Sequence, residues 1–138
     1  MKILICPLNG GLGHATRCVP IIRNLMNDGH EIVIAADGYP LEFLRQQFSN
    51  LRTIELPSYN IKYSSGKSQI LAMLGNIPAI ISGIYREHRW LNELLKQELF
   101  DQVISDNRFG LWAKSTKSVY ITHQLMIKMP LALKFLEP

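Results

Sequence analysis

The residues best suited to proton chemistry are a histidine and an aspartate that follow two apolar, strand-like runs. His14 lies in a glycine-rich turn, residues 9–17, which directly follows the run 3–6, and Asp106 directly follows the run 102–105. A histidine oriented by a carboxylate keeps one tautomer and can accept a proton from a substrate hydroxyl near neutral pH. The pair therefore predicts general-base catalysis. The structural alternatives are a histidine that bonds only backbone and an aspartate that caps a turn.

The turn around His14 has the composition of a phosphate-binding loop. Its glycines lack a Cβ, so the backbone can turn sharply and approach a ligand, and the amides of the following helix favour an anion. Arg17 is expected to meet a phosphate or Asp106, and His123 is either a second substrate-binding histidine or a structural one. The predicted substrate-binding residues are Gly10, Gly11, Leu12, Gly13, Arg17, Asn107, Arg108, His123 and Gln124.

Strand-like and helical segments alternate along the chain, which predicts an α/β fold with a parallel sheet and right-handed crossovers. Expected strands cover residues 3–6, 31–35, 51–56, 102–105 and 118–122. Expected helices run from an N-cap at Thr16 to about residue 28, from 39 or 40 to 48, and from 68 to 99 with an interruption near Gly75, Asn76 and Pro78. Ligands of such sheets bind beyond the carboxyl ends of the strands, so the residues predicted above should share one edge.

Size and charge narrow the classes of function. A chain of 138 residues that is 47% hydrophobic is long enough for one domain, 1–138, and too short for two. The net charge of +4 is spread along the chain, which favours an anionic small molecule or a membrane surface over nucleic acid.

The chain begins without a signal peptide, so a cytoplasmic location is expected. Cys6 and Cys18 are predicted to be buried thiols, and no metal site is expected.

Residues 68–85 carry no charged side chain, and two interpretations remain open. The segment is either a core helix packed on the sheet or a face that touches lipid, with Lys62, Lys67, Arg86 and Arg89 near anionic head groups. The polar segment 57–67 that precedes it is expected to line a cleft and to shape the choice of substrate.

A nicotinamide-dinucleotide domain of an oxidoreductase is the first alternative function. The turn after the first strand lies where such domains bind phosphate, and Asp37 after the second strand lies where they bind ribose. The match is partial, because Thr16 stands where the third glycine of the Gly11-x-Gly13-x-x-Gly pattern is required.

Four segments resemble the amino-terminal half of GT-B glycosyltransferases: residues 10–17 with the helix after them, 28–35, 103–110 and 120–124. The similarity is greatest to the branch that includes the lipid-linked N-acetylglucosamine transferase of peptidoglycan synthesis and related bacterial enzymes. This chain has Leu12-Gly13-His14 where that enzyme carries a further glycine before its histidine, so the acceptor need not be the same.

The resemblance implies a Rossmann-like parallel sheet flanked by helices, and it implies that two domains bind the two substrates. Two such domains face a cleft; the first holds mainly the acceptor, a hydroxyl compound that can be lipid-linked, and the second holds mainly the nucleotide-sugar donor. It also implies an inverting, metal-independent transfer without a cofactor, with His14 as the base and Asp106 as its partner. The chain would be the first half, inactive alone, at the inner face of the membrane. A non-catalytic subunit of a split transferase is the remaining alternative.

Overall fold

A parallel sheet carries the fold in the computed structural model, which describes residues 1–59 and 69–122. In this part of the chain the sheet has five strands, in the order β3-β2-β1-β4-β5. Their bounds are Lys2–Pro7 (β1), Glu31–Ala36 (β2), Arg52–Glu55 (β3), Gln102–Asp106 (β4) and Lys117–Ile121 (β5). Every predicted strand is confirmed, with ends that differ by one residue at most. The strand order reverses between β1 and β4, so the ligand site is expected where these two strands end.

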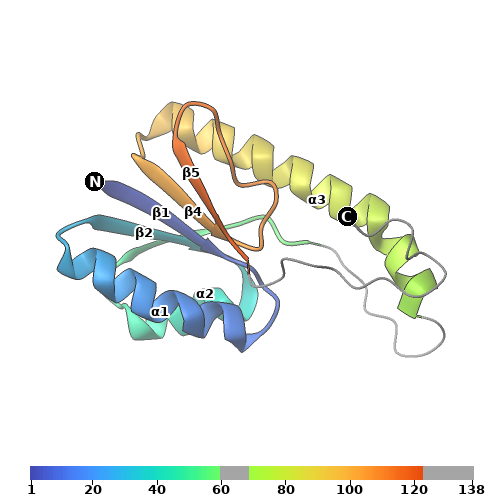
Figure 1. The fold of residues 1–138 in the computed structure, drawn as a ribbon, viewed down its shortest axis with the longest axis horizontal. Coiled ribbons are helices and arrows are strands. Elements are labelled where there is room, and N and C mark those ends of the chain that lie inside the picture. The colour runs from blue at the N-terminus through green and yellow to red at the C-terminus, as the bar shows by residue number, and fades with distance from the viewer. Residues whose placement is uncertain (60–68, 123–138) are drawn as a thin grey trace.

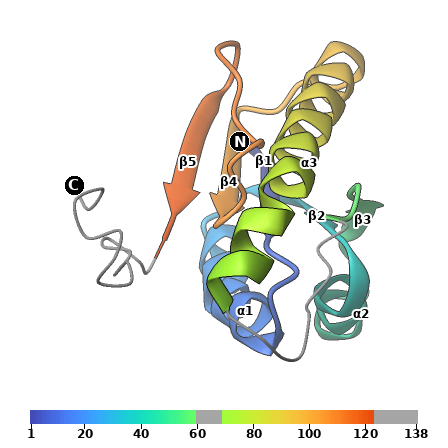
Figure 2. The same cartoon turned by 90° about the vertical axis from the view of Figure 1, so that its right-hand side faces the viewer.

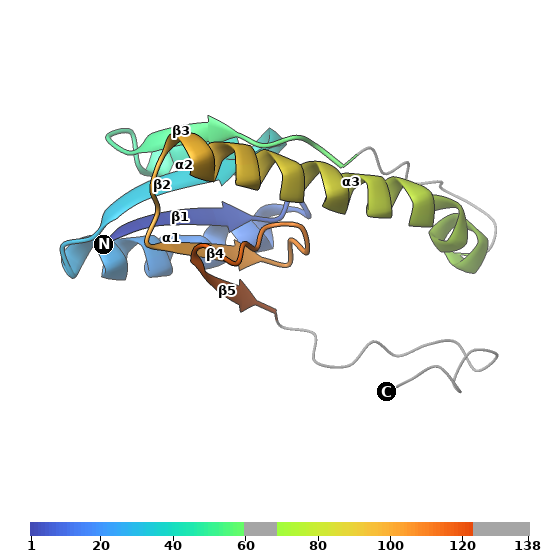
Figure 3. The ribbon, with the colours of Figure 1, turned by 90° about the horizontal axis from the view of Figure 1, so that it is seen from above.

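Helices cover both faces of the sheet. Figure 1 shows α1 (Leu12–Asn27) and α2 (Gly38–Gln47) on one face and the long α3 (Gln69–Gln97) on the other. Seen from above, α3 crosses the sheet and its first turns project past the strand ends (Figure 3). The predicted Rossmann-like α/β architecture is therefore confirmed.

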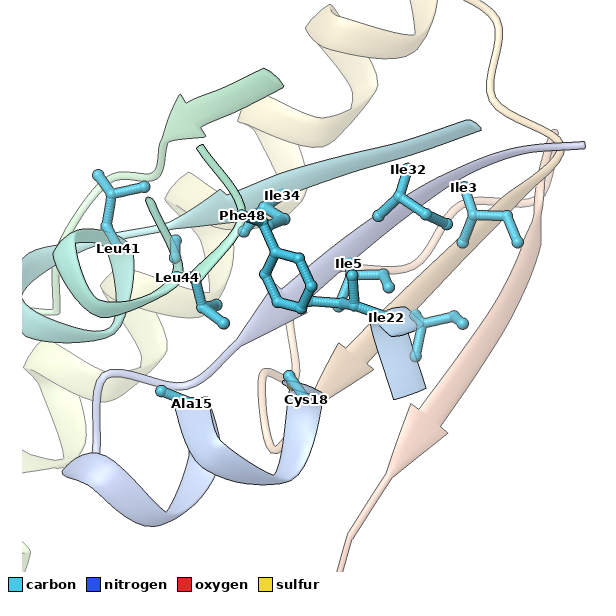
Figure 4. Close-up of a cluster of buried hydrophobic side chains, with 12 residues drawn as sticks. Ile3, Ile5, Ala15, Cys18, Ile22, Ile32, Ile34, Leu41, Leu44 and Phe48 are labelled. Carbon is cyan, nitrogen blue, oxygen red and sulfur yellow. The ribbon is translucent and has the colours of Figure 1, made fainter. Parts of the chain in front are cut away.

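The core consists of two layers because successive strand residues point to opposite faces. Ile3 and Ile5 of β1 pack with α1 and α2, in the cluster shown in Figure 4. Leu4 and Cys6 of the same strand pack beneath α3. Cys6 and Cys18 are both free and buried, as predicted, and burial raises the pKa of the Cys18 thiol to about 12.

Helix α1 begins five residues earlier than the sequence suggests. Its N-cap is Gly11, whose φ of 105° lies in the region that favours glycine, so the predicted cap at Thr16 is wrong. Thr16 lies inside the helix, where its Oγ1 donates to the carbonyl oxygens of Leu12 and Gly13. The first amides of α1 consequently lie immediately after β1, at the edge where a ligand is expected.

Helix α3 is continuous through Gly75, Asn76 and Pro78, so the predicted interruption is wrong. A proline removes one N–H group from the hydrogen-bond ladder, but packing can outweigh this loss. Buried positions recur every four residues at Gly83, Glu87 and Leu91, which places one face of α3 against the rest of the protein.

A cluster of charged side chains links the edge of the sheet where the strands begin, which is opposite their carboxyl ends. Lys2 Nζ lies 3.0 Å from Glu31 Oε1 and 2.7 Å from Glu98 Oε1, and Arg52 Nη1 lies 2.6 Å from the same Glu98 oxygen. Hydrogen bonds from Arg52 and Lys2 lower the pKa of Glu98.

This cluster predicts a pH-dependent contribution to stability. A lowered carboxyl pKa stabilises the fold above the pKa of the unfolded chain, and the contribution is lost as pH falls through the folded-state pKa. Glu98→Gln should therefore lower Tm at pH 7, and the difference from wild type should shrink as pH falls below the ordinary glutamate pKa of 4.5. Thermal melts of both proteins across this range test the effect, and a difference that stays constant with pH would exclude it.

Candidate active site at the strand ends

The structure brings His14 and Asp106 into direct contact. His14 Nδ1 lies 2.9 Å from Asp106 Oδ2, although 92 positions separate the two residues in the sequence. The contact forms because β1 pairs with β4 in parallel and Pro7 is the register partner of Asp106. The histidine follows one strand and the aspartate ends the other, so the pair spans the point where the strand order reverses.

The contact with Asp106 favours one tautomer of His14. A carboxylate only accepts hydrogen bonds, so the 2.9 Å contact favours the form with the proton on Nδ1 and the lone pair on Nε2. Arg17 reaches the same centre from the next turn of α1, with Nε 3.6 Å from Asp106 Oδ2 and Nη2 3.3 Å from His14 Nδ1. Asp106 is 1% exposed, so water screens these charges weakly.

The His14 ring lies directly on Gly10. A Cβ added at Gly10 would lie 3.2 Å from both Cδ2 and Nε2 of the ring, which is closer than side chains ordinarily pack. Glycine at this position therefore allows the imidazole to lie against the turn, with its Nε2 edge towards the backbone of the loop.

A cavity of about 460 Å³ lies at the same edge of the sheet. This volume is within the range of small-molecule sites. Gly10 belongs to the cavity wall, and the His14 ring lies on the side of Gly10 where a Cβ would stand, so the histidine is a neighbour of the cavity without lining it. The lining residues come from the strand ends and from α3, and they are Leu8, Asn9, Gly10, Asp37, Tyr59, Ile80, Asn107 and Phe109.

A network of buried charged side chains adjoins the cavity through Asp37. Arg108 Nη1 lies 2.7 Å from Asp37 Oδ1, and Arg108 Nε lies 2.5 Å from Glu87 Oε1. The Arg108 side chain is fully buried, and the same guanidinium donates to the carbonyl oxygen of Pro7. Burial alone would lower the pKa of Arg108, but Glu87 and Asp37 outweigh it and raise the pKa above its ordinary value.

The predicted substrate-binding residues divide into three groups. Gly10, Gly11, Leu12, Gly13 and Arg17 lie in or just after the turn at the strand ends, and Asn107 lines the cavity. Arg108 lies beneath the cavity, enclosed by carboxylates. His123 and Gln124 lie outside the described residues, as do Lys62 and Lys67.

Asn9 and Tyr59 lie in the segments 9–17 and 57–67, which the sequence predicts at this edge, whereas Glu87 was missed by sequence reasoning. Asn9 Nδ2 donates to Asp37 Oδ2 over 3.1 Å, and the Tyr59 hydroxyl donates to Glu87 Oε2 over 2.6 Å. Glu87 carried no signal except that a carboxylate on the buried face of a helix requires a partner. Asp37, the candidate ribose ligand of the dinucleotide hypothesis, uses both oxygens within the protein.

Among residues 1–59 and 69–122, no three histidine, cysteine or acidic side chains converge in a way that could hold a metal ion. The groups near the cavity can instead move a proton, through His14, and offer amides and Arg17 to an anion.

A comparison with protein families identifies the family of the chain. A family model described as glycosyl transferase family 1 matches residues 1–127. The chain belongs to this family of glycosyltransferases. A relative from Methanosarcina acetivorans, named as an uncharacterised glycosyltransferase, is 36% identical over 110 residues, which make up 79% of this chain and 28% of the relative. The chain thus spans less than a third of that relative, and the oxidoreductase alternative has no support.

Solved structures show the same fold. The glycosyltransferase SsfS6 of Streptomyces sp. SF2575 matches 98% of the chain and 42% of its own length, with a TM-score of 0.62 and 14% identity. MurG of Acinetobacter baumannii matches 93% of the chain and 36% of its own length, with a TM-score of 0.51 and 14% identity. The family member described here therefore has the GT-B type of α/β domain.

Proposed function

We propose that this chain is the acceptor-binding half of an inverting, metal-independent glycosyltransferase that moves a sugar from a nucleotide sugar to an acceptor hydroxyl. The observation that carries the proposal is the 2.9 Å contact between His14 Nδ1 and Asp106 Oδ2, beside a cavity at the reversal point of the sheet. A histidine held in this way presents the basic Nε2 to a hydroxyl group.

The reaction follows from the roles of these two side chains. Nε2 of His14 takes the proton of the acceptor hydroxyl as the oxygen bonds to the anomeric carbon. The bond from that carbon to the donor phosphate breaks, and the nucleoside diphosphate leaves with the electron pair. Attack from the side opposite the leaving group inverts the anomeric centre. Asp106 stabilises the imidazolium that forms, because its carboxylate already accepts the Nδ1–H bond.

The remaining residues are assigned to binding and to support. The turn from Gly10 to Gly13 and Arg17 would face the anionic part of the donor, whose nucleotide is held mainly by a second domain that residues 1–138 do not include. Asn107, His123 and Gln124 would contact substrate. Arg108 would organise the floor of the cavity, since its guanidinium is fully buried. A chain that lacks the donor domain would be inactive by itself.

A transfer assay tests this function. A longer protein, in which this chain is joined to a donor domain, is incubated with a panel of nucleotide sugars and hydroxyl acceptors in the presence of EDTA, and the products are separated by mass. We expect transfer without divalent metal and a product of inverted anomeric configuration by NMR. Retained configuration, or hydrolysis of the donor without transfer to any acceptor, would contradict the proposal.

A patch on α3 favours a second role, contact with the cytoplasmic face of a membrane where a lipid-linked acceptor would lie. Its residues lie on one side of the helix around a shallow hollow and combine apolar groups with two cations: Ile77, Pro78, Ile81, Ser82, Tyr85, Arg86 and Arg89. Ile81 and Tyr85 are 58% and 77% exposed. No helix in the described ranges is long and apolar enough to cross a bilayer. Apolar groups flanked by arginines suit the interface with anionic lipids.

A single charge on this patch should weaken membrane binding. Ile81→Glu places a carboxylate among the lipid-facing side chains and should reduce the fraction of protein that sediments with phosphatidylglycerol vesicles by severalfold, with Tm unchanged. Leu99→Glu is the matched control, because Leu99 is 87% exposed and lies after the end of α3. Equal sedimentation of wild type and Ile81→Glu would show that the patch on α3 does not bind the vesicles.

A further inference from the structure

Tyr59 is held in place by contacts on three sides of its side chain. Its hydroxyl donates to Glu87 Oε2 over 2.6 Å, and the Arg108 guanidinium lies 5.6 Å from the centre of its ring. The phenol is therefore tied to the same buried network that contains Asp37. Burial, followed by the hydrogen bond to Glu87, raises the pKa of Tyr59, so the phenol stays protonated and keeps donating.

Gly83 makes room for this ring on α3. A Cβ at Gly83 would lie 2.3 Å from Tyr59 Cδ1 and 2.5 Å from Cε1, so any other residue would displace the tyrosine. Glycine weakens a helix interior, and here its absence of a side chain lets the ring pack against the helix backbone. The segment that follows β3 is thereby fixed to the middle of α3.

The fastened ring is one wall of the cavity beside His14. Leu8, Ile80 and Phe109 provide further apolar walls, and Phe109 is 59% exposed. The polar groups lie towards the strand ends, where the Asp37 carboxylate is already satisfied by Arg108 and Asn9. Such a cavity suits a molecule that is apolar over most of its surface and carries its hydroxyl at one end.

We propose that Tyr59 is a specificity-determining residue, which restricts this cavity to an apolar, ring-sized part of the acceptor. The identification of the occupant as the acceptor rests on the proposed function. The restriction itself follows from the position of the ring between α3 and the strand ends. In this arrangement Gly83 and Glu87 are positioning residues, because they act through Tyr59.

Two fluorescent alcohols of different size test this proposal on the 138-residue chain. 2-Naphthol and 1-hydroxypyrene are titrated against wild type, Tyr59→Ala, Tyr59→Phe and Tyr39→Ala, and folding is checked by circular dichroism. Wild type should bind 2-naphthol saturably and should not bind glucose in its place. Tyr59→Ala should shift the ratio of the two dissociation constants about tenfold towards 1-hydroxypyrene, the scale on which hydrophobic pockets discriminate size.

The control variants distinguish a role of Tyr59 in lining the cavity from a general role in stabilising the fold. Tyr59→Phe keeps the ring and should keep the wild-type ratio, even if the lost bond to Glu87 lowers Tm. Tyr39 is an exposed tyrosine outside the cavity, so Tyr39→Ala should match wild type for both probes. If Tyr59→Ala does not fold, Tyr59→Leu, which keeps an apolar group over Gly83, should still move the ratio in the same direction.

Several outcomes would overturn the proposal. These are an unchanged ratio in a folded Tyr59→Ala or Tyr59→Leu chain, binding of glucose in preference to 2-naphthol, and no saturable binding of 2-naphthol by wild type. A Tyr59-dependent ratio in the 138-residue chain, together with no sugar transfer once the chain is joined to a donor domain, would uphold the size restriction and contradict the proposed function, so the two failures are distinguishable.

Discussion

Replacing His14 by alanine is expected to lower kcat for sugar transfer by about 10²- to 10⁴-fold in the longer protein that includes the donor domain, which is the range that a positioned general base contributes. The reason is the geometry at the strand ends, where Asp106 Oδ2 contacts Nδ1 of the imidazole and Nε2 is assigned the role of proton acceptor. KM for the nucleotide sugar should change little, since the donor is assigned mainly to the other domain. Steady-state kinetics with saturating donor provide the measurement.

A second variant, His30→Ala, shows whether the loss of any histidine lowers the rate. His30 lies at the opposite edge of the sheet, where Nδ1 contacts the terminal amine of Met1 over 3.2 Å. His30→Ala should leave kcat unchanged. Asp106→Asn should reduce kcat by a comparable factor to His14→Ala, because an amide no longer enforces the Nδ1–H tautomer. Wild-type turnover in a folded His14→Ala protein would remove His14 from the mechanism.

Removal of Arg108 is expected to cause the largest loss of stability. Arg108→Met keeps most of the volume but leaves Asp37 and Glu87, both buried, without their cation. Breaking a buried ion pair from one side costs about 3–5 kcal/mol, because the remaining charge is desolvated and uncompensated. Urea unfolding of the 138-residue chain measures the difference in free energy of unfolding.

Two further proteins make this prediction specific. Arg23 is exposed on α1, and Arg23→Ala should change the free energy of unfolding by less than about 0.5 kcal/mol. Combining Arg108→Met with Asp37→Asn and Glu87→Gln removes the charges together, so it should be less destabilising than Arg108→Met alone. A loss below about 1 kcal/mol for Arg108→Met would mean that the buried network contributes little.

The sheet was predictable from the sequence because its signals are local. Residues 3–6 and 31–35 are short apolar runs rich in branched side chains, and turn-forming residues follow them. Their alternation with helical segments limits the topology to a parallel sheet with helices on both faces. Once that topology is accepted, the side chains after β1 and β4 must lie at one edge, and the proximity of His14 and Asp106 follows.

Helix boundaries were less predictable, since they depend on packing. Thr16 is a common capping residue, but the chain bends earlier at Gly11, whose positive φ starts the helix directly after β1. Pro78 is a common helix breaker, yet α3 continues through it, although the buried face of the helix begins only at Gly83. In both places the local preference of a single residue type does not set the course of the helix.

Arg108 shows why the details of the site required the structure. Asp106, Asn107 and Arg108 are consecutive, and the sequence suggests that all three face a substrate. Asn107 has a φ of 54°, which turns the chain, and Arg108 then enters the interior between Asp37 and Glu87. Contacts between residues far apart in sequence, such as Tyr59 with Gly83, leave no local pattern.

The dependence of transfer on acceptor acidity tests the role of His14 most directly. Wild type and His14→Ala, each in the longer protein with the donor domain, are compared with 2-naphthol and with 4-nitrophenol, which loses its proton near neutral pH without a base. If His14 removes the acceptor proton, the variant should lose about 10²- to 10⁴-fold in rate with 2-naphthol and far less with 4-nitrophenol. Equal losses with both acceptors would contradict the assignment of His14 as the base.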